Sequence, residues 1–175
     1  MSKYRNAQEA RLTALISQNG TDLLAFLKRQ VDQPEDAADL ISETFVAAWR
    51  SLHRLPADDE DSRRWLFGIA KNVLRNHRRG SGRREALADR LRDTMRTTTF
   101  EIQPVSDIAL DVRSAVASLP EAQRDLIALI HWDGFAINEA AKIIGVTPST
   151  ARGRYQKARK SLRIAIEDRM KVQLP

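Results

Sequence analysis

The sequence predicts an all-α protein made of two small helical domains joined by a flexible linker. The first observation is a scarcity of turn residues, with 7 Gly and 6 Pro in 175 residues, about 7% against roughly 12% in average proteins. The second is that apolar residues recur at helical spacings in both halves of the chain. The third is a charged segment without a sustained apolar stripe at residues 83–106. We therefore expect domains at 1–82 and 107–175, with 83–106 as the linker.

The composition excludes several classes of protein. The chain has no Cys, which rules out a disulfide framework and any Cys-ligated zinc or iron–sulfur site. No apolar run is long enough to span a bilayer, and the N-terminus MSKYRNAQEARL lacks the apolar core of a secretion signal. We expect a cytoplasmic protein without direct membrane insertion.

No pattern in the sequence indicates catalysis. The three histidines, His53, His77 and His131, show no metal-ligand spacing with a carboxylate. There is neither a phosphate-cradling Gly loop nor a nucleophile elbow. We expect no metal, no cofactor, no small-molecule substrate and no enzymatic activity.

The charge distribution predicts a polyanion as partner. The net charge is +6, from 29 Lys and Arg against 23 Asp and Glu. Six bases and no acid lie from Lys71 to Arg84, and eight bases against two acids lie from Arg152 to Lys171. Two basic blocks in separate halves predict two contacts with one long anion.

Four helices are expected in the first half of the chain. One runs through Ala7–Ser17 and stops near Gly20, and the second opens at Thr21 or Asp22. Gln33-Pro34-Glu35 begins the third, because Pro suits the first helical turn and acids suit the positive end of the helix dipole. The apolar stripe of the third helix is Ala37, Ile41, Phe45, Ala48 and Leu52.

The fourth helix is expected to be capped near Ser62 and to end at Gly80-Ser81-Gly82. Its apolar stripe is Leu66, Ile69, Ala70 and Val73. The residues left mainly outside this stripe are basic or carry a side-chain amide: Lys71, Asn72, Arg75, Asn76, Arg78 and Arg79.

In the second half, helices are expected at about 107–118, 120–132, 137–144 and 148–166. The last two predict a helix-turn-helix, because the turn Gly145-Val146-Thr147 is followed by Pro148 in a first helical turn. On a helical projection, one face of the last helix is small or apolar and packs: Ala151, Tyr155, Ala158 and Leu162. The opposite face is polar and basic, as required to enter a major groove.

Four strings resemble the extracytoplasmic-function (ECF) group of bacterial sigma factors, in the sigma-70 family, and they occur in the order and separation typical of that group. They are DLISETF (39–45), WLFGIAKN (65–72), LPEAQRDLIAL (119–129) and GFAINEAAKIIGVTPSTARGR (134–154). The resemblance implies a sigma-two domain, a linker and a sigma-four domain. It also implies a protein that binds core RNA polymerase, recognises the −10 and −35 promoter elements and initiates transcription of a specific regulon. An anti-sigma factor is a further implied partner.

The resemblance assigns two surfaces to the first domain. The third helix docks on the polymerase clamp helices through Asp39, Leu40, Glu43 and Arg50. The fourth helix and the loop before it hold a flipped base of the −10 element, with these residues at the DNA: Lys71, Asn72, Arg75, Asn76 and Arg79. An amide suits base reading because it offers both a donor and an acceptor. Trp65 and Phe67 are candidate wedges for strand separation, although core packing is favoured for Trp65.

The resemblance assigns −35 recognition to the last helix, through Ser149, Thr150, Arg152, Arg154, Gln156, Lys157 and Lys160. Three residues depart from the family pattern. Ala136 replaces the usual Ser or Thr cap, Ala151 replaces a common Val, and Gly153 replaces a frequent Ser. These departures bear on the −35 preference and not on the fold.

Two alternative functions are weighed beside this one. An autonomous helix-turn-helix regulator would bind duplex DNA tightly without polymerase, usually as a dimer on a palindrome. A non-specific nucleoid-type protein would bind any DNA with a steep salt dependence.

Overall fold

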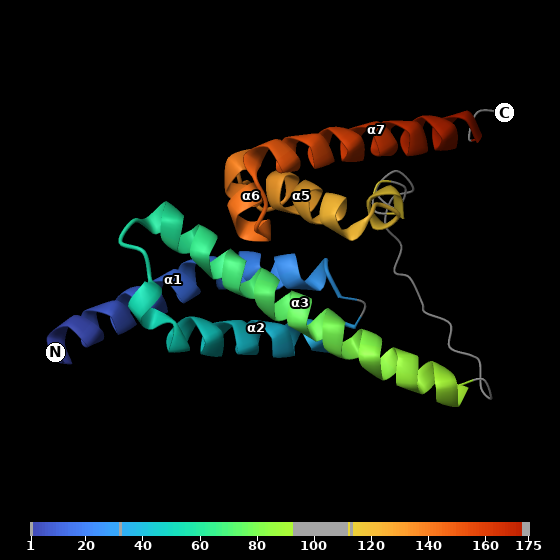
Figure 1. The fold of residues 1–175 in the computed structure, drawn as a ribbon. Coiled ribbons are helices and arrows are strands. Elements are labelled where there is room, and N and C mark those ends of the chain that lie inside the picture. The colour runs from blue at the N-terminus through green and yellow to red at the C-terminus, as the bar shows by residue number, and fades with distance from the viewer. Residues whose placement is uncertain (1, 32, 93–111, 113, 173–175) are drawn as a thin grey trace. The chain divides into compact units, whose positions relative to one another are not determined.

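The structure is a computed structural model that describes residues 2–31, 33–92, 112 and 114–172. All regular secondary structure in these residues is helical, so the predicted all-α class is confirmed. The chain divides into two compact units, Met1–Thr94 and Met95–Pro175, called here the N-terminal and C-terminal units (Figure 1). Of the predicted linker, residues 93–106 lie outside the described part of the chain.

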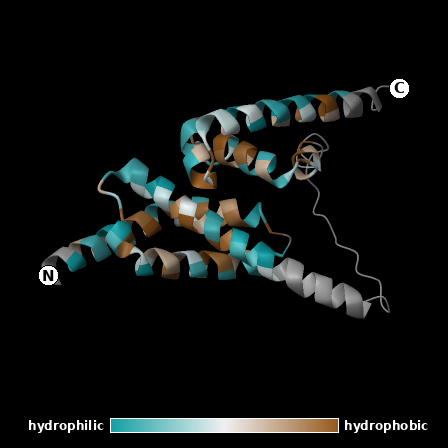
Figure 2. Cartoon of the chain, viewed as in Figure 1, coloured by the Kyte–Doolittle hydropathy of each residue, from teal (hydrophilic) through white to brown (hydrophobic). Residues whose placement is uncertain are grey.

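The N-terminal unit packs three long helices around one core. The helices are α1 (Ser2–Lys28), α2 (Pro34–Arg50) and α3 (Asp59–Arg92), with the short 3-10 helix η1 (Leu52–Arg54) after α2. Phe26 of α1 and Phe67 of α3 are fully buried, with ring centroids 5.6 Å apart and planes inclined by 60°. Figure 2 shows apolar segments interleaved with polar ones along each helix, which is the pattern of helices with one buried face.

The first two predicted helices are in fact one. The prediction that a helix stops near Gly20 is wrong, because α1 passes through that residue without a break. A glycine costs only about 1 kcal/mol relative to Ala inside a helix. Residues on both sides of it are buried in the same core, which outweighs that cost. They are Leu12, Leu15, Leu23, Phe26 and Leu27.

The predicted end of the fourth helix is also wrong. α3 continues through Gly80-Ser81-Gly82 to Arg92, so the first ten residues of the predicted linker are helical. Proline inside a helix removes a backbone hydrogen bond. Glycine lowers helix propensity but keeps its N–H, so the helix can continue through it. The residues that follow, Arg83–Arg92, are rich in strong helix formers.

The predicted apolar stripes are shifted slightly around their helices. In α2, Ile41 and Phe45 are only half-buried, whereas Leu40 and Thr44 lie fully in the core. The Thr44 hydroxyl donates a hydrogen bond to the Leu40 carbonyl at 2.7 Å, which satisfies it there. The stripe of α3 is shifted in the same way, because Phe67 and Leu74 are fully buried. Of the four residues predicted for it, Leu66 and Ala70 are buried, whereas Ile69 and Val73 are half-buried.

The C-terminal unit contains α5 (Glu121–His131), α6 (Ile137–Ile144) and α7 (Pro148–Val172), preceded by a helical stretch at residues 114–117. The predicted bounds of α6 are confirmed, and α7 runs six residues beyond its predicted end. Leu126, Leu129 and Ala151 are fully buried. A second cluster joins Leu119, Ile127, Ala158, Val116, Tyr155 and Leu162.

The turn between α6 and α7 has the predicted chemistry. Gly145 ends α6 with φ +74°, a left-handed conformation that glycine adopts without strain. Thr147 caps α7, because its Oγ1 accepts a hydrogen bond from the Thr150 amide at 3.2 Å. The predicted helix-turn-helix is therefore present.

Neither a membrane-spanning segment nor a metal site is found in the parts of the chain that the structure describes. No helix there is both long enough and apolar enough to cross a bilayer. No group of three or more His, Asp or Glu side chains within those parts is arranged to hold a metal ion.

Candidate nucleic-acid interface

The exposed side of α7 carries nearly all of its predicted DNA-contacting residues. Six of them are exposed: Ser149, Thr150, Arg152, Gln156, Lys157 and Lys160. Arg154 is half-buried, at the flank of this face. Ala151 and Ala158 are fully buried on the opposite side. The helix therefore packs through its small residues and presents its polar face to solvent.

The polar face of α7 extends further than predicted. Arg159 and Arg163 join Gln156 and Lys160 in lining an open hollow on the helix. The helical projection already contained the signal, because at 100° per residue Arg159 and Arg163 fall on the same side as Gln156. Arg163 extends the polar face by three residues, or about one turn, beyond Lys160.

Two contacts hold α7 against its neighbours. The Arg152 guanidinium donates a hydrogen bond to Asn138 Oδ1 of α6 at 3.3 Å. The ring of Tyr155 stacks on His131 of α5 at 5.9 Å, and the Tyr155 hydroxyl lies 3.0 Å from His131 Nε2. Within α7, the Arg159 guanidinium lies 5.9 Å from the Tyr155 ring centroid, which is within cation–π range. These contacts fix the orientation of the polar face.

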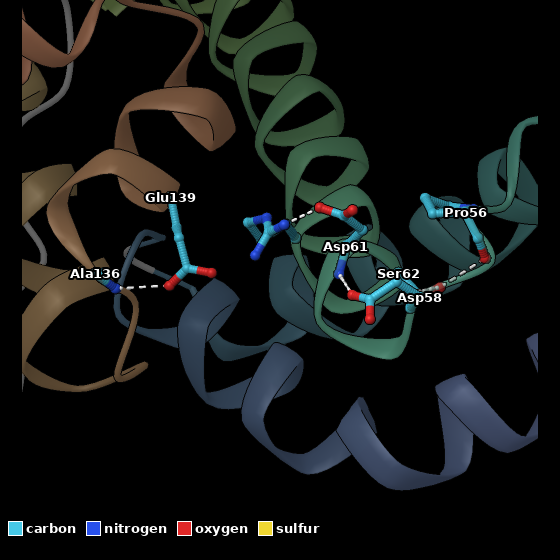
Figure 3. A network of polar contacts seen from close by, with 7 residues as sticks. Pro56, Asp58, Asp61, Ser62, Ala136 and Glu139 are labelled. Carbon is cyan, nitrogen blue, oxygen red and sulfur yellow. Dashed lines mark hydrogen bonds and ion pairs between the residues drawn. The ribbon is translucent and has the colours of Figure 1, made fainter.

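The start of α6 has half of a capping box. The Ala136 amide donates a hydrogen bond to Glu139 Oε2 at 2.8 Å, as Figure 3 shows. Alanine has no side-chain oxygen, so the reciprocal bond, in which the Glu139 amide would donate to a capping hydroxyl, cannot form. The departure noted in the sequence thus leaves the fold intact and removes one interaction.

The second candidate DNA surface lies along α3. Asn72, Arg75, Asn76 and Arg79 are exposed, and Lys71 is half-buried. Their spacing places them along one side of the helix.

The two candidate wedges for strand separation lie at the start of the same helix. Phe67 is buried in the core, so it is not a wedge, and Trp65 is half-buried.

The loop before α3 is fixed by its own side chains. Asp58 rather than the predicted Ser62 caps the helix, since Asp58 Oδ1 accepts a hydrogen bond from the Asp61 amide at 2.9 Å. Ser62 is buried in the first turn, where its hydroxyl contacts the carbonyls of Pro56 at 3.0 Å and Asp58 at 2.8 Å. Figure 3 shows the contacts of Asp58 with Asp61 and of Ser62 with Pro56. Asp61 also forms an ion pair with Arg64.

Further along α3, Arg78 contacts the α1–α2 connection and His77 contacts the start of α2. Arg78 donates hydrogen bonds to the Gln30 carbonyl at 3.0 Å and to Gln30 Oε1 at 2.7 Å. His77 Nε2 lies 3.5 Å from Asp36 Oδ2 in the first turn of α2. The polar face of α3 is thus anchored beside Asn76 and Arg79.

The exposed face of α2 is partly acidic and partly apolar. Asp39, Glu43 and Arg50 are exposed as predicted. Leu40 is a correction: it is 1% exposed and lies in the core, so it offers no surface to a partner.

The same face of α2 includes two large apolar residues that the sequence reading missed. Val46 is 49% exposed and Trp49 is 45% exposed. The signal was available, since both fall outside the apolar stripe predicted for this helix. Val46 follows Glu43 by three residues, and Trp49 follows Val46 by three. Residues at this spacing are neighbours on a helix surface, so both apolar side chains lie beside the acidic ones.

Comparison with known proteins identifies the family. Two family models match, Sigma-70 region 2 over residues 15–84 and Sigma-70, region 4 over residues 109–162. The ECF RNA polymerase sigma factor EcfG of Rhodopseudomonas palustris is 30% identical over 149 residues, which are 80% of this chain and 76% of that protein. The ECF RNA polymerase sigma factor SigF of Caulobacter vibrioides is 30% identical over 138 residues, with 78% and 74% covered. The chain belongs to the ECF group of sigma-70 family sigma factors.

A solved structure shows the same fold. The sigma factor RpoE of Bartonella quintana, in complex with the anti-sigma factor NepR, superposes with a TM-score of 0.62 at 24% identity. The match covers 95% of this sigma factor and 98% of that chain. The candidate DNA face of α3 lies inside the region 2 match, whereas residues 2–14 of α1 lie before it.

Proposed function

We propose that three surfaces of this sigma factor divide the work of promoter recognition. The exposed face of α2 binds the clamp helices of core RNA polymerase. The polar face of α3, with the loop before it, holds a base of the −10 element. The polar face of α7 reads the −35 element in the major groove. The C-terminal and N-terminal units correspond in this proposal to a sigma-four domain at 107–175 and a sigma-two domain at 1–82.

The observation that carries this proposal is that each unit presents its own basic helical face. The face of α3 exposes Asn72 and Asn76 among arginines, and amides read base edges as donor and acceptor. The face of α7 exposes Arg152 and Gln156 directly after a helix-turn-helix turn. Two separate base-reading faces suit a promoter with two separated elements.

The α2 face supports a protein partner rather than DNA. Asp39 and Glu43 would repel phosphate. Exposed Trp49 and Val46 supply the apolar area typical of the centre of a protein interface. An anti-sigma factor is a further proposed partner, because the similar Bartonella quintana sigma factor is found bound to one. The protein itself catalyses no covalent step in this proposal, and it acts in the cytoplasm, where polymerase meets the promoter.

Run-off transcription with purified core polymerase tests the proposal. We expect transcripts from a promoter with matched −10 and −35 elements only when both core polymerase and this protein are present. An autonomous regulator would instead bind its DNA tightly without polymerase. A nucleoid-type protein would show no dependence on the two promoter elements.

A further inference from the structure

Arg11 lies on α1, four residues before the segment that matches the sigma-70 region 2 model. Its side chain contacts the loop before α3. Arg11 Nη2 donates hydrogen bonds to the carbonyls of Pro56 and Ala57, each at 2.8 Å. These contacts join residues 45 and 46 positions apart in the sequence.

The two carbonyls belong to a loop that has little regular structure of its own. Residues 55–58 are neither helix nor strand, and Ala57 and Asp58 are exposed. The Pro56 carbonyl also accepts a hydrogen bond from Ser62. One carbonyl therefore receives a donor from α1 and another from α3, and the loop is tied to both helices at this point. A guanidinium donor makes a stronger hydrogen bond to a carbonyl than a neutral group does.

α1 also supports the first turn of α3 next to this loop. Arg63 Nε donates to Asn19 Oδ1 at 3.1 Å, and Arg63 Nη2 lies 3.6 Å from Asp22 Oδ2. These contacts hold the helix itself. The Arg11 contacts instead hold the backbone that leads into it.

We propose that Arg11 is a positioning residue for recognition of the −10 element. It acts through the carbonyls of Pro56 and Ala57 and does not itself contact the base. The inference rests on the proposed function, in which this loop and α3 form the pocket for a flipped base. A loop already held in place spares the ordering entropy that capture of the base would otherwise cost. Arg11 thereby makes the start of α1 part of promoter selectivity.

The experiment compares Arg11→Met with Arg11→Lys in the full-length protein assembled with core polymerase. Met keeps most of the apolar stem and removes the donors, whereas Lys keeps a charged donor. Arg5→Met is the matched control, because Arg5 is exposed on the same helix and pairs with Glu9 within it at 3.0 Å. Asn72→Ala serves as a variant of the pocket itself. The template is a promoter selected by the unmodified protein from a library with a randomised −10 element.

The main measurement is the ratio of transcription from the matched promoter to that from a promoter with one −10 base substituted. We expect Arg11→Met to lower this ratio by about three- to tenfold, which corresponds to the loss of one or two hydrogen bonds. Core affinity should stay within about twofold of the unmodified protein, a change well below the tenfold that 1.4 kcal/mol represents. Arg11→Lys should recover most of the ratio, and Arg5→Met should not change it.

Hydrogen exchange separates positioning from general destabilisation. Arg11→Met should speed exchange at the Asp61 and Ser62 amides, which bond to Asp58, without changing exchange in the buried turns of α2. An unchanged ratio in Arg11→Met, in a protein whose Asn72→Ala variant loses selectivity, overturns the inference while leaving the proposed pocket intact. Faster exchange throughout the N-terminal unit also overturns it, since Arg11 would then support the whole fold. No selectivity in the unmodified protein overturns both.

Discussion

Arg75 Nη2 donates a hydrogen bond to Asn72 Oδ1 at 2.9 Å, from a position three residues further along α3. The contact turns the amide oxygen of Asn72 toward the arginine. Asn72 is exposed, so its Nδ2 group is left as the donor that faces solvent. If Asn72 reads a base, it does so in this orientation as a donor to an acceptor on the base edge.

Asn72→Asp is therefore as informative as Asn72→Ala. Asp keeps an acceptor for Arg75 and removes the two amide donors, whereas Ala removes both functions. We expect both variants to reduce −10 discrimination by about 1–3 kcal/mol, the usual value of a specific base contact, while core binding is retained. The loss should be larger on duplex promoters than on pre-melted templates, measured by run-off transcription. Full discrimination by Asn72→Asp would mean that the amide donors make no base contact.

The acidic side chains of α2 provide a test of polymerase binding. Asp39→Arg combined with Glu43→Arg should weaken holoenzyme assembly without loss of helicity, because both residues are exposed. Leu40→Ala gives the contrasting result, because Leu40 is buried and its truncation creates a cavity that costs about 2–5 kcal/mol of stability. Core affinity and circular dichroism together distinguish the two effects. Normal assembly by the folded double variant would remove this face from the interface.

Trp49 tests the apolar part of the same face. Because it is 45% exposed, Trp49→Ala should change the free energy of unfolding little, as is usual for surface substitutions. Large aromatic residues often dominate binding energy, so we expect a loss of about 2 kcal/mol in affinity for core polymerase. Titration of labelled protein with core polymerase measures this loss. Equal affinity for both proteins would show that the exposed tryptophan lies outside the contact.

Local signals in the sequence were sufficient for the helix-turn-helix. Gly145 ends α6 by its left-handed conformation, and Thr147 caps α7 with its side chain. Both effects depend only on residues close by in the sequence, so the bounds of α6 were predicted correctly. The basic faces of α3 and α7 followed from helical periodicity for the same reason.

Local sequence signals could not predict contacts between residues that are distant in the sequence. The continuity of α1 past Gly20 depends on packing against two other helices, and local propensity pointed the other way. Leu40 is buried because α2 is rotated slightly about its axis relative to the prediction. The five apolar residues of the predicted stripe did not determine that rotation closely enough. The Arg11 contact with the Pro56 carbonyl spans 45 residues, and nothing in either local sequence indicates it.

Ala136 offers a prediction about stability. Ala136→Ser should complete the capping box that Glu139 already half forms, and it should stabilise the C-terminal unit by about 1 kcal/mol. Amide hydrogen exchange in the first turn of α6 measures this locally in the full-length protein. Ala136→Val is the control, since it enlarges the exposed side chain without adding a hydroxyl, and Val is as poor an N-cap residue as Ala. Slower exchange in both variants would show that the cap is not the cause.

Two neighbouring residues of α7 should differ in their effect on the −35 element. Gln156 is exposed at the centre of the polar face, and its amide can bond both donor and acceptor groups of an adenine edge. Arg154 is half-buried at the flank, a position suited to a backbone phosphate. Gln156→Ala should relax the preference at one −35 base pair, at a cost of about 1–3 kcal/mol there. Arg154→Ala should weaken all promoters about equally and lower the salt dependence of binding by about one unit of slope.

A library of −35 point variants, transcribed by each holoenzyme at several salt concentrations, separates these outcomes. Each variant serves as the control for the other. Only Gln156→Ala should change the base preference, and only Arg154→Ala should lower the salt dependence. The prediction depends on the burial of Ala151 and Ala158, which sets the rotation of α7 about its axis. If Arg154→Ala changes the base preference and Gln156→Ala leaves it unaltered, then α7 meets the major groove through its flank and the assignment of its reading face is wrong.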